Sequence, residues 1–287
     1  ITGDTAMLQL DVCLETVFPG TPAEERITRI AECGYNCVEF WMHDSTQDAP
    51  DGAQRKDPKA LRQACAAAGV AINNFVVNPP DDGSTGGAPV MSETHKRYLE
   101  RVAECIEFGK AAGCSKAITC AGNETPGRSW EQMRATIEKA LGEAAALAEK
   151  HQFTLLLEPL NTHVDHKGYC LSSSDAGAGI VRDIGSPALR LLYDVYHMQI
   201  MEGNVIDHIR RNMDAIGHFH SAGVPGRGEH YEGELNYPGI LHAIEKTGYK
   251  GAFGLEYFPK LRDHAQSLRN VRQYLLQPAS GSGPCCC

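Results

Sequence analysis

Short apolar runs typical of β-strands alternate with longer amphipathic stretches about eight times along the chain. The longer stretches repeat their apolar positions at helical spacing, and turn-forming residues separate them from the short runs. We predict strands at residues 8–14, 36–41, 70–77, 115–120, 153–158, 189–194, 215–220 and 251–256. We predict helices at residues 22–33, 57–68, 91–112, 129–150, 173–184, 204–212, 238–246 and 262–276.

Proline and glycine positions support these boundaries. Thr21-Pro22 and Asp57-Pro58 place proline at the first position of a helix, directly after a residue that can cap it. Glycines expected to form left-handed C-caps precede the next strand at Gly34, Gly69, Gly113, Gly185 and Gly248. Repeated strand–helix units imply right-handed crossovers and a parallel sheet. Their number and the chain length favour a single α/β domain with a (β/α)8 TIM barrel, and a doubly wound sheet is the alternative.

The domain organisation predicted from the sequence is simple. No linker or change in composition divides the chain before Pro278, so we expect one barrel domain over residues 1–277. Residues 278–287 are expected to be a disordered or appended tail. Residues 78–89 are rich in turn formers and follow the third predicted strand, at the carboxyl-terminal face of a barrel. Either a lid or a solvated loop fits that segment.

Composition and charge exclude several classes of function. The chain is 42% hydrophobic and 22% charged, and no apolar run approaches the roughly 18 residues that span a bilayer. The net charge is -9 and no stretch is rich in lysine or arginine, so the electrostatic signature of a nucleic-acid binder is missing. No Gly-x-Gly-x-x-Gly sequence begins a helix, so we expect no nucleotide cofactor. An enzyme acting on a small molecule is the remaining expectation.

The cysteines indicate the redox environment. Cys285, Cys286 and Cys287 belong to the expected tail, and the remaining cysteines form no Cys-x-x-Cys pair. Most of them lie in apolar segments, where a free cysteine acts as a small hydrophobic residue. Reduced thiols fit a reducing compartment, so we expect the cytoplasm. Because the chain begins with Ile1, export after removal of a targeting peptide is the alternative.

Four consecutive predicted strands end in a residue that can bind a metal ion: Glu158, Asp194, His220 and Glu256. The carboxyl ends of the strands face one mouth of a parallel barrel, so these side chains are expected to converge there. Each alone would be an ordinary polar strand end, but four in succession indicate a site. Three carboxylates and an imidazole, without a thiolate, favour one divalent cation such as Mg²⁺, Mn²⁺ or Co²⁺.

Three further residues are candidates for contact with a substrate. His197 is placed on the loop that leaves the sixth strand, and a histidine at a helix start is the alternative. Arg227 lies in a glycine-rich loop, where its guanidinium offers a bidentate fork to a carboxylate or to neighbouring oxygens. A solvated loop charge is the alternative for Arg227. Glu39 lies inside the second predicted strand and qualifies if its side chain points into the barrel mouth.

Several motifs of the chain resemble those of hydroxypyruvate isomerases. They are Leu-Glu-Pro-Leu-Asn at 157–161, Tyr-Asp-Val-Tyr-His-Met-Gln at 193–199, Met-Glu-Gly at 201–203, Ile-Gly-His at 216–218, Arg-Gly-Glu at 227–229, Gly-Glu-Leu-Asn-Tyr at 233–237 and Gly-Leu-Glu-Tyr at 254–257. Those enzymes belong to the xylose isomerase-like barrels, which also include the ketose 3-epimerases. The resemblance covers essentially the whole predicted barrel and is densest over residues 158–257.

The resemblance implies one divalent cation held by Glu158, Asp194, His220 and Glu256. It also implies that Glu158 and Glu256 form an acid–base pair and that His197 and Arg227 contact substrate oxygens. Homo-oligomers are usual among such relatives. The third ligand position, commonly Gln in hydroxypyruvate isomerases and His in the epimerases, is His220 here. Residues 78–89 also lack the Gly-Asp-Trp and Gly-Glu-Arg-Gly motifs associated with the isomerases, so the substrate stays open.

This set of residues suits proton transfer next to a carbonyl group. A divalent cation that chelates a carbonyl oxygen and the adjacent hydroxyl acidifies the C–H between them and stabilises the enediolate. Return of the proton to the neighbouring carbon gives isomerisation, whereas return to the opposite face of the same carbon gives epimerisation. The leading hypothesis is an isomerase that interconverts hydroxypyruvate and tartronate semialdehyde, with Arg227 neutralising the substrate carboxylate. Alternatives are a ketose 3-epimerase or other sugar isomerase, a lyase on an oxidised sugar, and a non-catalytic sugar-binding barrel.

Overall fold

A computed structural model of the chain describes residues 8–42, 56–78 and 87–277. In these residues parallel strands follow one another around a closed barrel, in which the last strand is hydrogen-bonded to the first. The strands are β1 (Gln9–Cys13), β2 (Cys37–Met42), β3 (Ala71–Val76), β4 (Lys116–Cys120), β5 (Thr154–Glu158), β6 (Leu189–Asp194), β7 (Ile216–Ser221) and β8 (Ala252–Leu255). The predicted (β/α)8 barrel is confirmed, and the doubly wound alternative is wrong.

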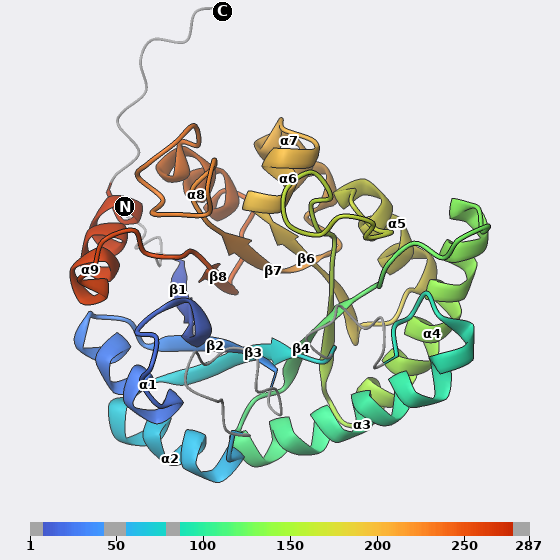
Figure 1. Ribbon diagram of the computed structural model, residues 1–287, viewed down its shortest axis with the longest axis horizontal. Helices are drawn as coiled ribbons and strands as arrows, with labels where there is room; N and C mark the ends of the chain where they lie inside the picture. The colour runs from blue at the N-terminus through green and yellow to red at the C-terminus, as the bar shows by residue number, and fades with distance from the viewer. Residues whose placement is uncertain (1–7, 43–55, 79–86, 278–287) are drawn as a thin grey trace, which may run out of the picture.

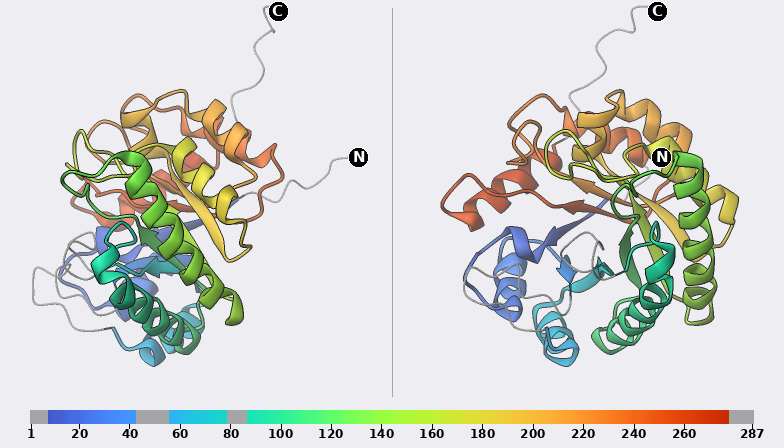
Figure 2. Two further views of the ribbon diagram at one scale, coloured as in Figure 1. Left: turned by 90° about the vertical axis from the view of Figure 1, so that its right-hand side faces the viewer. Right: turned by 45° about the vertical axis from the view of Figure 1, so that its right-hand side comes forward.

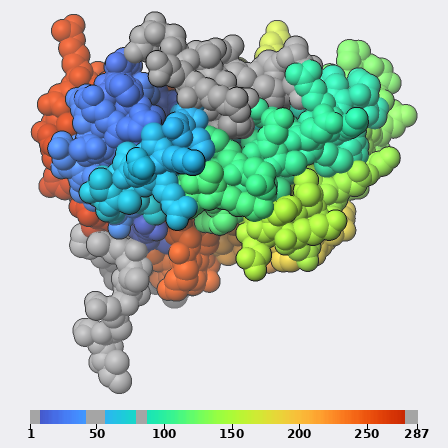
Figure 3. Space-filling view, turned by 90° about the horizontal axis from the view of Figure 1, so that it is seen from below, coloured from blue at the N-terminus to red at the C-terminus, as the bar shows by residue number. Residues whose placement is uncertain are grey.

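Helices lie outside the ring of strands and connect them. Within the described residues they are α1 (Ala23–Glu32), α2 (Pro58–Ala68), α3 (His95–Ala112), α4 (Trp130–Lys150), α5 (Ser174–Ile184), α6 (Val195–Met201), α7 (Val205–Asn212), α8 (Tyr237–Glu245) and α9 (His264–Leu275), with 3-10 turns η1 (Leu14–Thr16) and η2 (Ser92–Thr94). The helices surround the strands in each ribbon view (Figures 1 and 2). On the side shown in Figure 3, α1, α2 and α3 lie next to one another. No helix of the described ranges is both long and apolar enough to cross a membrane.

Most predicted boundaries lie within one or two residues of the observed ones. Asp57 caps α2 by accepting a hydrogen bond from the Lys59 N–H at 2.9 Å, and Gly69 ends that helix in the left-handed conformation. Pro22 occupies the N-cap of α1 rather than its first helical position, so that prediction is wrong by one residue. The proposed lid or loop at 78–89 falls largely outside the described residues, and the tail at 278–287 falls wholly outside them.

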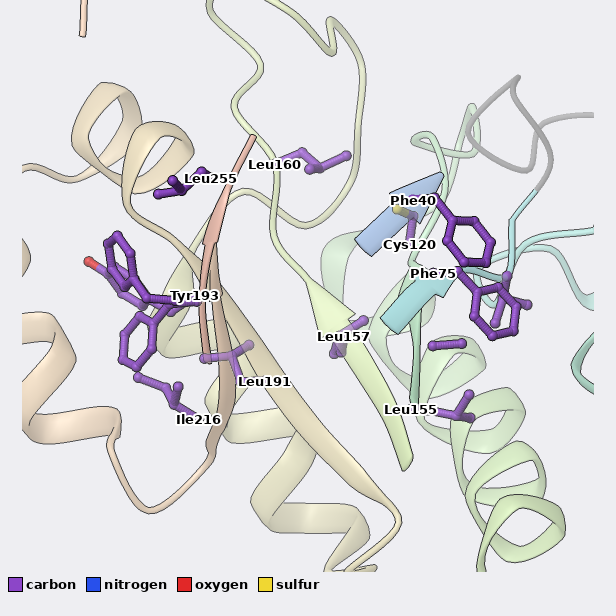
Figure 4. Packing of buried hydrophobic residues seen from close by; sticks show 14 of the residues in the cluster. Phe40, Phe75, Cys120, Leu155, Leu157, Leu160, Leu191, Tyr193, Ile216 and Leu255 are labelled. Carbon is purple, nitrogen blue, oxygen red and sulfur yellow. The ribbon is translucent and has the colours of Figure 1, made fainter. Parts of the chain in front are cut away.

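An outer apolar layer lies between the strands and the helices (Figure 4). The ring of Phe40 on β2 stacks on that of Phe75 on β3 with centroids 5.3 Å apart, and Phe108 of α3 meets both rings edge-on. Because successive side chains of a strand point to opposite faces, the neighbours of Phe40 in the sequence, Glu39 and Trp41, face the barrel interior.

The barrel interior is apolar on one side and polar on the other. Val76, Ile118, Leu156 and Leu192, from β3 to β6, form a small apolar cluster against which Trp41 packs. The polar side contains buried residues of β1, β2, β3 and β7, which are Asp11, Glu39, Asn73, Asn74 and His218. The Asn74 Nδ2 atom lies 3.1 Å from His218 Nε2, and this contact between β3 and β7 crosses the interior because the two strands are not neighbours.

Candidate functional site

Glu158, Asp194, His220 and Glu256 come together at the carboxyl end of the barrel. Glu158 ends β5 and Asp194 ends β6. His220 is the penultimate residue of β7, and Glu256 directly follows β8. Their ligand atoms lie within 4.8 Å of one another, and all these side chains are buried. The structure therefore brings together the side chains that the sequence predicted from the strand ends. We call Glu158, Asp194, His220 and Glu256 the four-residue cluster.

The carboxyl groups of the four-residue cluster have different pKa values because their neighbours differ. Burial raises the pKa of Glu158 above its ordinary value. Burial also raises the pKa of Asp194, to about 7. At Glu256 burial acts in the same direction, but Arg227 and His220 outweigh it and lower the pKa. A proton is therefore retained among the carboxyl groups near neutral pH unless a cation takes its place.

Two side chains hold the carboxylate of Glu256. The indole Nε1 of Trp41 donates a hydrogen bond to Oε1 at 2.6 Å, and the guanidinium of Arg227 contacts Oε2. The guanidinium also lies over the ring of Tyr196, 5.0 Å from its centroid. The backbone of Arg227 has a φ of 53°, in the left-handed region that residues other than glycine rarely adopt. These contacts place the positive charge of the Arg227 guanidinium directly beside Glu256.

His197 lies on helix α6, and its predicted position on a loop is wrong. The reason is that Asp194 caps this helix: its Oδ1 accepts hydrogen bonds from the N–H groups of Tyr196 (2.7 Å) and His197 (3.4 Å). The Nδ1 of His197 accepts hydrogen bonds from Asn161, so a neutral ring carries its proton on Nε2, 3.4 Å from Asp194 Oδ2. Burial lowers the pKa of His197 well below its ordinary value. The neutral imidazole therefore helps to orient Asp194.

Glu39 lies in the polar interior of the barrel and is buried. Its Oε2 accepts a hydrogen bond from Asn74 Nδ2 at 2.8 Å and lies 3.0 Å from His218 Nε2. Its Oε1 lies 3.0 Å from Nε2 of His220. Burial opposes ionisation of this carboxyl group, but His220 and His218 outweigh it and lower the pKa of Glu39 to about 2. Glu39 is thus a buried carboxylate next to the four-residue cluster.

Sequence reasoning missed several side chains around the cluster. Trp41 could have been found, because it follows Glu39 by two positions and so shares the inward face of β2. His218 likewise precedes His220 by two positions on β7. Asn74 could not have been found in this way, because β3 has one more residue than β2 between the pairs Val38–Ile72 and Phe40–Phe75. Such a β-bulge changes which side chains point inward and is not visible in the sequence.

The four-residue cluster fits a metal ion. The Nδ1 of His220 lies 3.5 Å from Glu256 Oε2 and 3.7 Å from Glu158 Oε1. Among the described residues it has no hydrogen-bond partner, although buried polar atoms usually have one. Once it loses its proton, this nitrogen can serve as a ligand atom beside three carboxyl groups. A cation there would also compensate the charge of those groups when they ionise.

A family model described as "Xylose isomerase-like TIM barrel" matches residues 27–274, and the chain belongs to this family. Hydroxypyruvate isomerase of Escherichia coli K12 is 31% identical over 264 residues, which cover 90% of this chain and 96% of that enzyme. The 2-oxo-tetronate isomerase of Cupriavidus necator is 31% identical over 238 residues, or 82% of this chain and 87% of that enzyme. These relatives identify the chain as an isomerase.

A solved structure shows the same fold over nearly the whole chain. It is described as AP endonuclease, family 2, from Brucella melitensis, and it superposes with a TM-score of 0.83 at 27% sequence identity. The match covers 93% of this chain and 99% of that chain. The described residues of this protein therefore share the barrel fold of that structure.

Proposed function

We propose that the protein is a metal-dependent isomerase that interconverts hydroxypyruvate and tartronate semialdehyde. The observation that carries this proposal is the pair Glu158 and Glu256, buried in one cluster with pKa values displaced in opposite directions. A carboxyl group whose pKa is raised and one whose pKa is lowered in the same site are suited to act as the acid and the base of a proton transfer. The activities named for the two relatives support a reaction on a short 2-oxo acid.

One divalent cation, Mg²⁺, Mn²⁺ or Co²⁺, would be held by Glu158, Asp194, His220 and Glu256. Oxygen donors with a single imidazole suit these ions. When bound, the cation would supply Lewis acidity, which lowers the pKa of the C–H next to the substrate carbonyl and stabilises the enediolate charge.

The two glutamates carry the proton between carbon atoms. Glu256, kept ionised by Arg227, takes a proton from C3 of hydroxypyruvate, the carbon that bears the hydroxyl group. Glu158 delivers a proton to C2. The hydroxyl proton on C3 passes to the oxygen on C2, so that C3 becomes the aldehyde and C2 the secondary alcohol. The reverse reaction uses the same groups with their roles exchanged.

Arg227 is the proposed partner of the substrate carboxylate. Its guanidinium contacts Glu256 while 15% of the side-chain surface stays exposed. Contact of His197 with a substrate oxygen, the other role that the resemblance implies, has less support. That side chain is 1% exposed and its Nε2 approaches Asp194.

His220 supports a second candidate, a ketose 3-epimerase. The histidine at the third ligand position is the residue that the resemblance associates with epimerases, and the same carboxyl pair serves either reaction. Epimerisation requires the proton to return to the carbon that lost it, on the opposite face. The two candidates therefore differ in the position at which solvent deuterium enters the substrate.

Proton NMR in D₂O tests both candidates. The Mn²⁺-loaded protein would be freed of excess ion and incubated with hydroxypyruvate, 2-oxo-tetronate, fructose, psicose or tagatose, and spectra recorded after the protein is removed. We expect tartronate semialdehyde from hydroxypyruvate, with the activity lost in Glu158→Gln, in Glu256→Gln and on chelation. If only 2-oxo-tetronate were converted, the substrate would be this longer acid. If deuterium entered only at C3 of a ketose, the enzyme would be an epimerase. Full activity in either glutamine variant would contradict the acid–base pair.

A further inference from the structure

The two ring nitrogens of His220 face different carboxyl groups. Nδ1 faces Glu158 and Glu256 of the four-residue cluster, at 3.7 and 3.5 Å. Nε2 lies 3.0 Å from Oε1 of Glu39. Because β7 and β2 are not neighbours in the barrel, this second contact crosses the interior rather than following the sheet. His220 therefore connects the cluster with the polar interior.

The interior holds Glu39 in a defined position. Asn74 Nδ2 donates to its Oε2 at 2.8 Å, and His218 Nε2 lies 3.0 Å from the same oxygen. The other oxygen, Oε1, has no well-aligned hydrogen bond with any described residue, and neither has Nε2 of His220. The 3.0 Å between these two atoms is nevertheless within the range of an N–H···O hydrogen bond.

Gly254 of β8 leaves room for this contact. A Cβ atom at residue 254 would lie 2.8 Å from Oε1 of Glu39 and 2.7 Å from Cδ2 of His220. Gly254 is not among the glycines with a positive φ, so the backbone conformation does not require glycine there. Glycine is needed at residue 254 because the side chains of Glu39 and His220 approach its backbone too closely to leave space for a Cβ atom.

We propose that Glu39 is a positioning residue for His220, and not a contact for the substrate. Its Oε1 accepts the Nε2–H hydrogen bond, which keeps the proton on Nε2 and turns the Nδ1 lone pair toward the four-residue cluster. Carboxylates that orient a histidine ligand in this way typically strengthen metal binding about 10–100-fold. This inference rests on the metal site of the proposed function.

The test is the affinity of the metal-free full-length protein for Mn²⁺, measured by calorimetry, together with the visible spectrum of the Co²⁺-loaded protein. We expect Glu39→Gln to lose about 10–100-fold in affinity and to change the Co²⁺ spectrum, because the ring loses its orientation. Glu39→Asp, which keeps the charge but withdraws it from Nε2, should also bind more weakly. It serves as the second variant if Glu39→Gln does not fold.

Glu202→Gln is the matched control. Glu202 is a half-buried carboxylate whose oxygens accept hydrogen bonds from the N–H (2.9 Å) and Oγ (2.6 Å) of Ser174, at the start of α5. This variant should bind Mn²⁺ as the wild type does. A double-mutant cycle adds specificity, because in a His220→Gln background the change Glu39→Gln should have no further effect.

The outcomes separate this inference from the proposed function. If the wild-type protein binds no divalent cation, the metal site itself is wrong. If the wild type binds and Glu39→Gln matches it in affinity and spectrum, the metal site stands and the positioning role is wrong. The role is also wrong if Glu39→Gln weakens binding equally in the His220→Gln background. Two ions per wild-type chain and one in Glu39→Gln would make Glu39 a ligand and overturn the inference.

Discussion

Glu158 and Glu256 are residues of the same type in the same buried cluster, but their neighbours shift the pKa values of the two carboxyl groups in opposite directions. Trp41 contacts one carboxylate oxygen of Glu256 and Arg227 the other, and both contacts favour the ionised form. Glu158 has no such partner among the hydrogen bonds of the described residues, and burial raises its pKa. Two residues of the same type therefore have pKa values shifted in opposite directions because different side chains surround them.

Replacing Arg227 by alanine should separate acidic from neutral substrates. The variant should lose more kcat/KM for hydroxypyruvate than for a ketose, because only the acid needs a cation to pair with its carboxylate. A charged hydrogen bond contributes about 1.5–3 kcal/mol, so the additional loss should be about 10- to 100-fold. Steady-state kinetics with both substrates would measure it, with Arg227→Lys as the control that keeps the charge without the planar fork. Equal losses for both substrates would contradict the assigned role.

At the scale of the elements, the junction of β6 and α6 serves structure and chemistry at once. Asp194 ends the strand, caps the helix with Oδ1, and belongs to the four-residue cluster. The helix has no amphipathic pattern to reveal it, because Val195, Tyr196, His197 and Met198 are all buried. The other helices expose one face, so their periodicity predicted them correctly.

Two substitutions of Asp194 should separate its structural role from its role in the cluster. Asp194→Asn keeps an oxygen that accepts the capping hydrogen bonds, whereas Asp194→Ala removes it. The alanine variant should have a free energy of unfolding about 0.5–2 kcal/mol lower than the asparagine variant, measured by urea denaturation of the metal-free protein. Both variants should bind Mn²⁺ weakly. Equal unfolding free energies would show that the cap contributes nothing.

On the scale of the whole molecule, closure of the barrel creates the site. The strands of the described residues are all parallel, so the ends of β5, β6, β7 and β8 share one mouth, although α5 to α8 lie between them in the sequence. The polar side of the interior continues from this mouth through His220 to Glu39. Because this site joins several strands, a ligand that binds only there should stabilise the complete fold.

We therefore expect Mn²⁺ to raise Tm by several degrees, since a ligand at 100 times its Kd stabilises the folded state by about 2.7 kcal/mol. The increase should be larger at about pH 8 than at about pH 6. Folded metal-free protein keeps a proton on Asp194 up to about pH 7, whereas the unfolded chain loses it near 3.8. The stability due to this raised pKa is present at low pH and is lost as the pH rises through 7, where the cation replaces the proton.

Thermal unfolding with and without Mn²⁺ at the two pH values measures this effect. Glu202→Gln should respond as the wild type does, because its carboxyl group lies outside the four-residue cluster. A pH-independent increase in Tm would exclude Asp194 as the group whose proton the cation displaces.

Local patterns in the sequence were enough to predict the strands, most helices and the residues at the strand ends. Each of those features depends on the periodicity of one segment or on the residue that ends it. The pKa difference between Glu158 and Glu256, the capping role of Asp194 and the contact of Glu39 with His220 required the folded barrel. They depend on distances between residues far apart in the chain, on a β-bulge in β3 and on the absence of a side chain at Gly254. Such distances are set by barrel closure and packing, which no single segment encodes.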